Sequence, residues 1–498
     1  MQFASIDYLL LLAVGAIVYF ALPGVRSRTV WLLGISYAFY YSLSASWTVV
    51  LLGITLVGYV FGLLIQRSGV GSADEPVPPT TRWLLGAGIG IVVATLFVFK
   101  YVGFASQLLS AAAPFLHTGS RFGLITLVLP IGISFWTFQT IAYLADIAKG
   151  KLPAETNPLT YALFIAFFPQ VTAGPIARGG QLLDQLTTKH RFDYLRMRSG
   201  LLLMLWGFFK KLVVADPLGV IVNKVYGAPH QFGSRPLVLL VATLAFSVQI
   251  YCDFSGYTDI VRGSARLFDV DLLPNFNRPY FSKSIKEFWR RWHMSLMGWF
   301  KDYIYIPLGG SRVGQWRRYV NILAVFLVSG LWHGAGLTFV FWGLLNGVYQ
   351  IAGEMLAPLR DRVAGALRLQ PDGPVRSILA TLTTFALITA AWVFFRAQSL
   401  ADAIYILRSM VPMAWHSGDV NTILRLSIGR TELMVTLAGV VVVFAYEWLS
   451  LRYDIVQMLL RRNVVVRWAV YQTAIMSVVV FGYYGSVYSA AAFAYFKF

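Results

Sequence analysis

PLVLLVATLAFSVQIYC, at residues 236–252, is a stretch of the chain without a single charged side chain. An α-helix of about 20 apolar residues crosses the hydrocarbon core of a bilayer, so this stretch predicts a transmembrane helix. Hydrophobic residues make up 57% of the chain and charged residues 13%, which is about half the charge of an average soluble protein. The sequence therefore predicts a helical membrane protein. Comparable apolar runs lie at residues 6–22, 46–65, 83–99, 377–395, 432–449 and 468–488.

The charge distribution predicts which loops face the cytoplasm. The net charge is +19, and in a membrane protein such an excess more often marks cytoplasmic loops than nucleic-acid binding. Arg26 and Arg28 follow the first apolar run and only Asp7 precedes it, which predicts an N-terminus on the outer side. The chain threaded from there gives an all-α transmembrane bundle of about 11–12 spans, plus re-entrant segments. The basic loops then lie inside, at residues 67–82, 149–151, 178–198, 262–318, 353–376 and 452–467.

The cysteine count and the residues around the first apolar run limit how the chain can be organised. Cys252 is the single cysteine, so an intramolecular disulfide and a cysteine-based zinc site are both excluded. The first apolar run has no basic stretch before it and no obvious small-residue cleavage site, so we expect a retained span. The sequence shows no internal repeat and no separate soluble domain. We expect one integral membrane domain over residues 1–498, with no metal and no bound cofactor.

Two apolar segments carry residues that interrupt a helix. FFPQVTAGPIARGG, at 167–180, has two prolines and basic residues on both sides, so it predicts a re-entrant segment. SGLWHGAGLTFVFWG, at 329–343, sets His333 among three glycines. Non-helical backbone at membrane depth survives only where protein or a water-filled cavity surrounds it. His333 is therefore expected to face an enclosed cavity.

Of the six histidines, only His293 and His333 lie in aromatic or apolar surroundings. Helical spacing places His293 on one face of an amphipathic helix with Trp289, Trp292, Leu296 and Phe300. Each histidine has a structural alternative, as a hydrogen-bonded core residue for His333 and an interfacial anchor for His293. Ionisable groups inside a membrane are functional candidates by default, and imidazole is well matched to proton transfer near neutral pH. Both histidines are candidate catalytic residues.

The other face of the same helix is basic. Lys286, Arg290 and Arg291 lie on it, and Lys283 precedes it. Such a surface suits either the anionic lipid headgroups of the inner leaflet or an anionic substrate carrier. The candidate substrate-binding and donor-binding residues are Lys283, Arg290, Arg291, Trp289, Trp332 and Asn277.

Charged side chains also lie within predicted spans. GFFKKLVVAD, at 207–216, contains Lys210 and Lys211, and QIYCDFSGYTDI, at 249–260, contains Asp253 and Asp259. Intramembrane charges generally pair with one another, so ion pairs between these segments are favoured over a proton path. A coupling site in a secondary transporter or polysaccharide export component is the alternative from another functional class.

Several motifs resemble the membrane-bound O-acyltransferase family, and in particular its alginate-type branch. The two most telling are NRPYFSKSIKEFWRRWHMSLMGWFKDYIYIPLGG at 277–310 and SGLWHGAG at 329–336. The resemblance covers a core at about 120–405, with further spans in 1–119 and 406–498. Its other motifs are LPIGISFWTFQTIAYLADI at 129–147, FFPQVTAGPI at 167–176, QIYCDFSGYTDI at 249–260 and VFFRAQSLADA at 393–403.

The resemblance implies a fold, an activity and two site residues. The fold is a bundle of transmembrane helices with re-entrant segments around a central funnel or tunnel. The histidine of the WHG stretch, His333, is the catalytic one, and His293 matches the second polar residue of the family's pair. With His333 as general base, the acceptor hydroxyl loses its proton as it attacks a thioester carbonyl. An acyl-histidine intermediate stays open as an alternative.

The resemblance also implies substrates and partners. The donor is acetyl-CoA or another acyl thioester on a carrier at the cytoplasmic side, and the acceptor is an extracytoplasmic polysaccharide such as alginate. A periplasmic SGNH-type acetyltransferase is the implied partner, and the bacterial inner membrane is the implied location. Membrane lipids surround the bundle, and no nucleic acid is expected. A related branch transfers D-alanine to teichoic acids, which is the alternative within the family.

Overall fold

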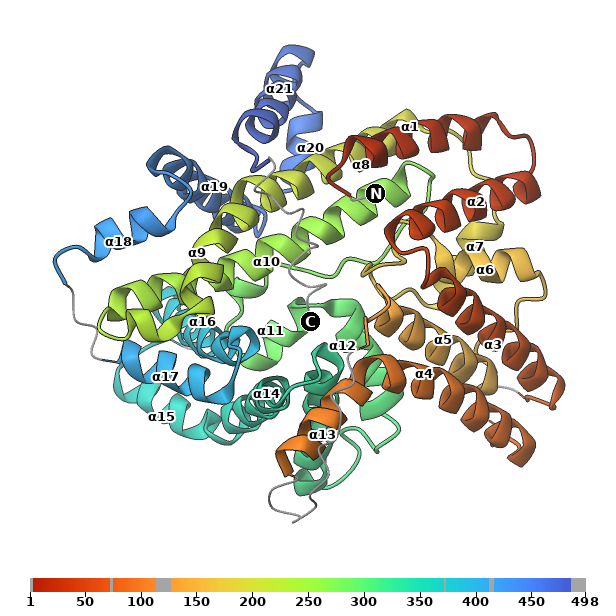
Figure 1. The fold of residues 1–498 in the computed structure, drawn as a ribbon, viewed down its shortest axis with the longest axis horizontal. Coiled ribbons are helices and arrows are strands. Elements are labelled where there is room, and N and C mark those ends of the chain that lie inside the picture. The colour runs from red at the N-terminus through yellow and green to blue at the C-terminus, as the bar shows by residue number, and fades with distance from the viewer. Residues whose placement is uncertain (1–2, 72–74, 113–126, 371–372, 412–415, 485–498) are drawn as a thin grey trace. The chain divides into compact units, whose positions relative to one another are not determined.

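The computed structural model describes residues 3–71, 75–112, 127–370, 373–411 and 416–484. Within these ranges the chain folds into helices joined by short turns, and no named strand occurs (Figure 1). The predicted all-α fold is therefore confirmed. Contacts divide the chain into two compact units, one of residues 1–202 with 261–274 and one of residues 203–260 with 275–498. The division falls within helices α8 and α10.

The first unit contains the N-terminal helices. Its helix α5 is buried along almost its whole length, and helices α3, α4, α6 and α7 pack around it. Gly58 and Gly62 of α3 allow this close packing, because a Cβ at either position would lie under 3 Å from a tyrosine side chain of the neighbouring elements. The helices are α1 Ile6–Ala21, α2 Val25–Leu43, α3 Thr48–Arg67, α4 Pro79–Ala112, α5 Ile133–Ala148, α6 Pro158–Ala166, α7 Gly179–Thr187 and the first part of α8 Tyr194–Phe208.

The segment between α6 and α7 is the predicted break in the first unit. Residues 167–178 are not helical. Residues 167–177 are buried, and residue 178 is partly exposed. The indole Nε1 of Trp136 donates to the backbone oxygen of Val171 at 2.6 Å. The amide of Gln170 donates to the oxygen of Phe164 at 3.1 Å. Non-helical backbone thus lies inside protein, as expected, while its re-entrant course through the bilayer stays a prediction.

The second unit contains the remaining helices. A π-helix, η1, continues α8, and the long helices α10 and α16 contribute to a core rich in tryptophan and phenylalanine. Its elements are η1 Phe209–Ala215, α9 Asp216–Gly227, η2 Pro229–Phe232, α10 Pro236–Arg266, η3 Pro279–Phe281, α11 Ile285–Arg291, α12 Met294–Phe300, η4 Lys301–Tyr305, α13 Gln315–His333, α14 Leu337–Met355, α15 Ala357–Ala366, α16 Pro374–Arg396, α17 Leu400–Met410, α18 Asp419–Leu426, α19 Arg430–Leu449, α20 Ile455–Leu460 and α21 Val464–Phe481.

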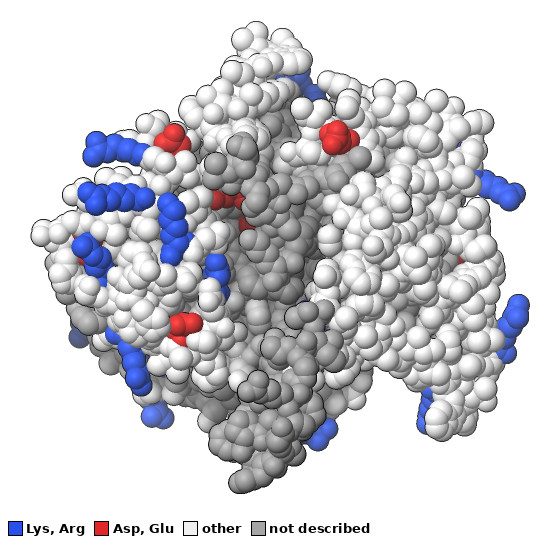
Figure 2. Space-filling view, viewed as in Figure 1, with Lys and Arg blue, Asp and Glu red and all other residues white. Residues whose placement is uncertain are grey.

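Several of these helices are long and apolar enough to cross a membrane. In the described residues there are six: Thr48–Arg67, Pro79–Ser106, Pro236–Arg266, Pro374–Arg396, Arg430–Leu449 and Val464–Phe481. The first predicted run forms the shorter apolar helix α1. In Figure 2 the visible Lys and Arg lie mainly toward the left side and the right edge, and most of the other described surface is uncharged. Many large apolar side chains are exposed. The molecule is a multi-pass membrane protein, and the total of about 11–12 spans stays a prediction.

Candidate active site

Helices α13 and α14 form a hairpin that holds His333 at its bend. Glycines bring the two backbones together: a Cβ at Gly330 would lie 2.3 Å from the oxygen of Phe339, and one at Gly343 would lie 2.3 Å from the oxygen of Phe326. Gly343 and Gly347 belong to a G-x-x-x-G spacing that favours such close packing of helices in membranes. His333 is the last residue of α13, so the predicted break after this histidine is confirmed.

His333 lies in an aromatic enclosure within the second unit. The residue is 5% exposed. The ring centroid lies 4.8 Å from Trp332, 4.9 Å from Trp342 and 5.6 Å from Phe395. His333 is therefore buried among aromatic rings, while the cavity that it was expected to face stays a prediction.

One hydrogen bond fixes which nitrogen of His333 carries the proton. Nδ1 lies 2.6 Å from the backbone oxygen of Ser329, one helical turn earlier. A carbonyl oxygen only accepts, so Nδ1 must donate, and the neutral ring then carries its lone pair on Nε2. This is the tautomer in which Nε2 can take a proton from a substrate.

The helix predicted to carry His293 is interrupted at that residue. The expectation of one helix with Trp289, Trp292, His293, Leu296 and Phe300 on a face was wrong in its continuity, because α11 ends at residue 291 and α12 begins at 294. His293 has φ 46°, in the left-handed region that non-glycine residues rarely adopt. The physical reason is a short pairing of the chain with residues 275–277, which pulls residue 292 into an extended conformation. All five side chains are nevertheless buried.

The structure brings the two candidate histidines to the same tryptophan. The His293 ring centroid lies 5.9 Å from that of Trp332, which in turn lies 4.8 Å from that of His333. Phe254 packs edge-to-face on His293 at 4.8 Å. His293 is 1% exposed. Two residues 40 positions apart in the numbering thus line one buried aromatic region.

The other candidate residues fall into two groups. Trp289 and Trp332 are buried, and Trp289 packs on Trp342 at 5.7 Å, so both belong to the aromatic region. Lys283 and Arg290 are exposed and lie outside it.

The remaining donor candidates have surface partners. Arg291 pairs with Glu287 of the same helix at 2.7 Å. Asn277 is exposed, and its Oδ1 accepts a hydrogen bond from Nε of Arg278 at 2.9 Å. The asparagine that is buried in this segment is Asn275, at 0% exposed, which the sequence analysis did not single out. Its signal was its place two residues before the motif at 277–310.

The charged residues of the predicted spans form ion pairs. Lys210 lies 2.6 Å from Asp259, and Lys211 lies 2.6 Å from Asp253. The favoured ion-pair interpretation is confirmed by these distances. Lys211 also lies 2.7 Å from Asp216, a partner that the sequence analysis missed. The spacing of five residues is unusual in an α-helix and arises here because η1 is a π-helix.

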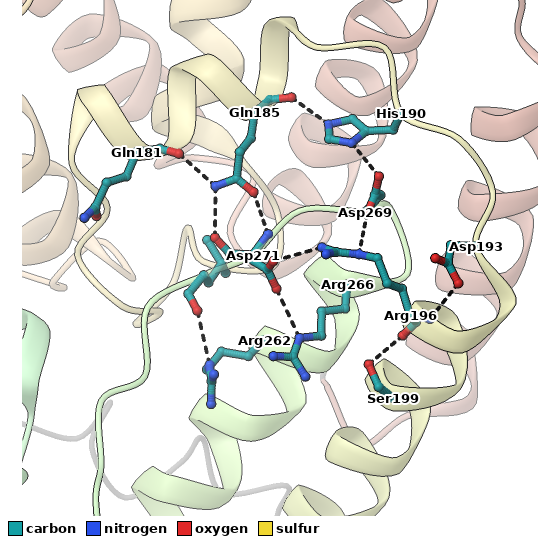
Figure 3. A network of polar contacts seen from close by, with 11 residues as sticks. Gln181, Gln185, His190, Asp193, Arg196, Ser199, Arg262, Arg266, Asp269 and Asp271 are labelled. Atoms are coloured by element: carbon teal, nitrogen blue, oxygen red, sulfur yellow. Dashed lines mark hydrogen bonds and ion pairs between the residues drawn. The ribbon is translucent and has the colours of Figure 1, made fainter. Parts of the chain in front are cut away.

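A third buried histidine belongs to a polar network of the first unit (Figure 3). Nδ1 of His190 lies 2.8 Å from Oδ2 of Asp269, and Nε2 lies 2.7 Å from the backbone oxygen of Gln185. Arg196 pairs with Asp269, and also with Asp271 at 2.9 Å. The sequence placed His190 in a loop, which is confirmed, but gave no sign of its burial or its partners.

The arginines of this network change the pKa of Asp271. Partial burial alone would raise the pKa of this carboxyl. The hydrogen bond and charge of Arg196, together with Arg266, outweigh that effect and hold the pKa below the usual value. The network therefore stabilises the ionised carboxylate.

These features define a polytopic helical membrane protein with a buried, aromatic-lined histidine site. Among the described residues, no three His, Cys, Asp or Glu side chains are placed to hold a metal ion. The histidine site contains two imidazoles, aromatic rings and the backbone oxygen of Ser329.

Comparison with known proteins identifies the class of enzyme. The model of the membrane-bound O-acyltransferase family matches residues 147–368, which include both candidate histidines. The chain is 34% identical over 423 residues to the probable alginate O-acetylase AlgI of Pseudomonas putida, with 84% of this chain and 82% of that protein covered. It is 35% identical over 434 residues to the peptidoglycan O-acetyltransferase of Helicobacter pylori, covering 80% and 77%.

A more distant relative is the teichoic acid D-alanyltransferase of Bacillus subtilis, 28% identical over 318 residues that cover 61% of this chain and 78% of that protein. The chain belongs to the membrane-bound O-acyltransferase family, and it is a membrane O-acyltransferase of the AlgI type. The resemblance predicted from the motifs is confirmed. The relatives imply an acyl donor and a polysaccharide acceptor.

Proposed function

We propose that the chain moves acetyl groups from a cytoplasmic thioester donor across the membrane for O-acetylation of an extracytoplasmic, alginate-like polysaccharide. The observation that carries this proposal is the hydrogen bond from Nδ1 of His333 to the oxygen of Ser329. It presents Nε2 as the basic nitrogen of a ring that aromatic side chains enclose. His333 is the general base in this proposal, and His293 orients the substrate or stabilises developing charge.

The proton follows a closed path in this mechanism. Nε2 of His333 takes the proton of the acceptor hydroxyl as its oxygen bonds to the thioester carbonyl carbon. The tetrahedral intermediate then expels the thiolate by breaking the carbon–sulfur bond. The imidazolium returns its proton to the thiolate, so the thiol leaves and His333 is neutral again. The overall reaction replaces the thioester bond of the donor with an oxygen ester bond of the acceptor and needs no further reactant.

The donor and its route complete the proposal. Acetyl-CoA and a phosphopantetheinyl carrier both present a thioester on a slim anionic arm, and the exposed Lys283 and Arg290 suit such a charge. Arg291, Trp289, Trp332 and Asn277 are proposed to contribute along the way. One integral membrane domain over residues 1–498, in the bacterial inner membrane, would place donor and acceptor on opposite sides.

The motif resemblance suggests the partner, and the names of the relatives suggest the acceptor. A periplasmic SGNH-type acetyltransferase would complete transfer to the polymer. D-Alanyl transfer to teichoic acid is the second candidate, because the Bacillus subtilis relative carries that name, but its identity is lower and its coverage shorter. Transport as a primary function is disfavoured, since Lys210, Lys211, Asp253 and Asp259 satisfy one another in ion pairs.

Labelled donors test this proposal directly. The host for this test normally acetylates its polysaccharide, but its own acetylase has been deleted. Membranes of this host that contain the chain should transfer radiolabelled acetyl groups from acetyl-CoA to the polysaccharide. Matched membranes without the chain are the control. Label that enters polymer from a D-alanyl carrier and not from acetyl-CoA would replace acetyl transfer with D-alanyl transfer.

A further inference from the structure

Asn275 lies beside the backbone of His293. Phe276 pairs with Trp292 in an isolated antiparallel bridge, which brings the two neighbouring residues together. The backbone N–H of Met294 then donates to the backbone oxygen of Asn275 at 2.9 Å. Residues distant in sequence thus meet at the point where His293 enters the aromatic region.

The side chain of Asn275 acts as a remote cap for helix α12. His293 is the N-cap residue of this helix, yet its own side chain makes no capping hydrogen bond. Oδ1 of Asn275 instead accepts hydrogen bonds from the backbone N–H of Ser295 at 3.2 Å and from its Oγ at 2.6 Å. A capping oxygen normally comes from the N-cap side chain itself. Asn275 therefore helps to hold His293 in its left-handed conformation, which costs free energy for a non-glycine residue.

The cap also fixes the orientation of the amide. A backbone N–H only donates, so the atom that faces Ser295 must be Oδ1, and Nδ2 must lie at the other end of the group. Asn275 is 0% exposed, and Nδ2 has no hydrogen-bond partner among the described residues. A buried donor without an acceptor costs about 1–3 kcal/mol, and folded proteins leave few of them. An oxygen of a bound substrate would satisfy it.

We propose that Asn275 is a further catalytic residue, whose Nδ2 donates a hydrogen bond to the acyl carbonyl oxygen of the thioester. This inference rests on the proposed acyl transfer and names a group that the reaction needs. As the oxygen of the acceptor hydroxyl bonds to the carbonyl carbon, the π electron pair of the carbonyl moves onto the carbonyl oxygen. The proton of the hydroxyl moves to His333. The pair returns when the carbon–sulfur bond breaks and the thiolate takes that proton.

The surroundings make such a donor valuable. Phe254 and Trp332 border His293 with apolar rings, and Phe254 also packs on Phe276, next to Asn275, at 5.0 Å. Negative charge that develops among apolar rings is poorly stabilised without a fixed donor, because the local dielectric is low. A preorganised donor to such an oxyanion contributes about 10²–10³-fold to the rate.

The substitution Asn275→Asp separates the donor from the cap. The new carboxyl keeps an oxygen for Ser295, and when ionised it lacks both amide N–H groups. The initial rate of thiol release from acetyl-CoA, measured with polysaccharide-containing membranes, should fall about 10²–10³-fold relative to wild type at alkaline pH. The ratio of variant to wild type should rise as pH falls, since protonation restores one O–H donor. The unfolding midpoint should stay near that of wild type at low pH, where the neutral carboxyl still accepts from Ser295, and should fall at alkaline pH, because an ionised carboxylate is costly at a buried position.

The matched control is Ser295→Ala, which removes one contact to Oδ1 and leaves both amide protons. It should retain activity within a few-fold and show a flat ratio across pH. If Asn275→Asp keeps wild-type activity with a flat ratio, or if Ser295→Ala loses as much activity, Asn275 acts as a cap alone and the catalytic role is overturned. Wild-type and His333→Ala membranes in the same assay show whether the proposed acetyl transfer itself fails. An inactive wild type overturns the proposed acetyl transfer together with this role, whereas an active wild type with an inactive His333→Ala leaves the transfer standing.

Discussion

His190 and His333 are buried to a similar degree, at 8% and 5% exposed, but their ring nitrogens are used differently. His190 faces an acceptor at each nitrogen, the carboxylate of Asp269 and the backbone oxygen of Gln185. Both ring nitrogens are therefore taken up by contacts within the protein. His333 instead commits Nδ1 to a backbone oxygen, which leaves Nε2 as the basic atom. The use of the nitrogens, and not burial, therefore separates a structural histidine from one suited to move a proton.

The largest expected effect is on His333. Replacement by Ala should lower polymer O-acetylation by about 10²–10⁴-fold, because the general base is removed. Protein amount and membrane insertion should stay as in wild type. Acetyl content of the polymer, divided by the amount of chain in the membrane, measures the effect. His230→Ala is the control, because that side chain is 65% exposed. Wild-type acetylation in the His333 variant would remove the distinction between the two histidines.

The next effect concerns the glycines that set the position of His333. A Cβ at Gly343 would meet the backbone oxygen of Phe326, so Gly343→Ala should force α14 away from α13. Overpacking of this kind costs about 1–3 kcal/mol, and a displacement of about 1 Å at a catalytic group can lower the rate by about 10²-fold. Thermal unfolding in detergent and the acetyl-transfer rate measure the two consequences.

Gly353→Ala on the same helix is the matched control. A Cβ there would meet no heavy atom within 4 Å. Alanine also favours a helix over glycine by about 1 kcal/mol, so this variant should be as stable as wild type or slightly more stable. If both variants behave alike, close packing of the hairpin does not set the position of His333.

The position of His333 at a break in an apolar segment could be predicted from the sequence. The burial and the partners of His190 could not. Apolar runs fixed the helical membrane class through length and composition alone. The glycines around His333 predicted the break in the chain, because they are adjacent to it in the sequence. His190 sits among basic residues in a loop, and its partner Asp269 comes from a distant segment. Burial that depends on such a tertiary contact leaves no local pattern.

The same limit explains the errors near His293. A helical wheel placed the aromatic side chains correctly on a buried face, but it could not show that the pairing of Trp292 with Phe276 interrupts the helix. It also could not show the π-helix that brings Asp216 to Lys211, because the wheel assumes α-helical spacing throughout.

A smaller effect is expected at His190 itself. His190→Ala removes two hydrogen bonds and leaves the oxygen of Gln185 and part of Asp269 without a donor, which should cost about 1–3 kcal/mol of folding stability. Acetyl transfer per folded molecule should equal that of wild type, because both ring nitrogens already contact groups of the protein. Thermal unfolding and specific activity are measured on the same preparation. A large loss of specific activity at unchanged stability would assign His190 a chemical role and break the comparison.

The smallest effect tests the electrostatics of the His190 network through Asp271. Its pKa lies below the usual value in the folded chain because Arg196 and Arg266 favour the carboxylate. A lowered pKa in the folded state contributes stability that is complete above the unfolded pKa, near 3.8, and is lost as pH falls through the folded value. Asp271→Asn should therefore unfold at a lower temperature than wild type near pH 6, and the two midpoints should converge below about pH 4. The side chain is 52% exposed, so added salt should shrink the difference as well. A difference that persists unchanged at acid pH and high salt would mean that Asp271 acts through its hydrogen bonds and shape, and that its charge contributes nothing.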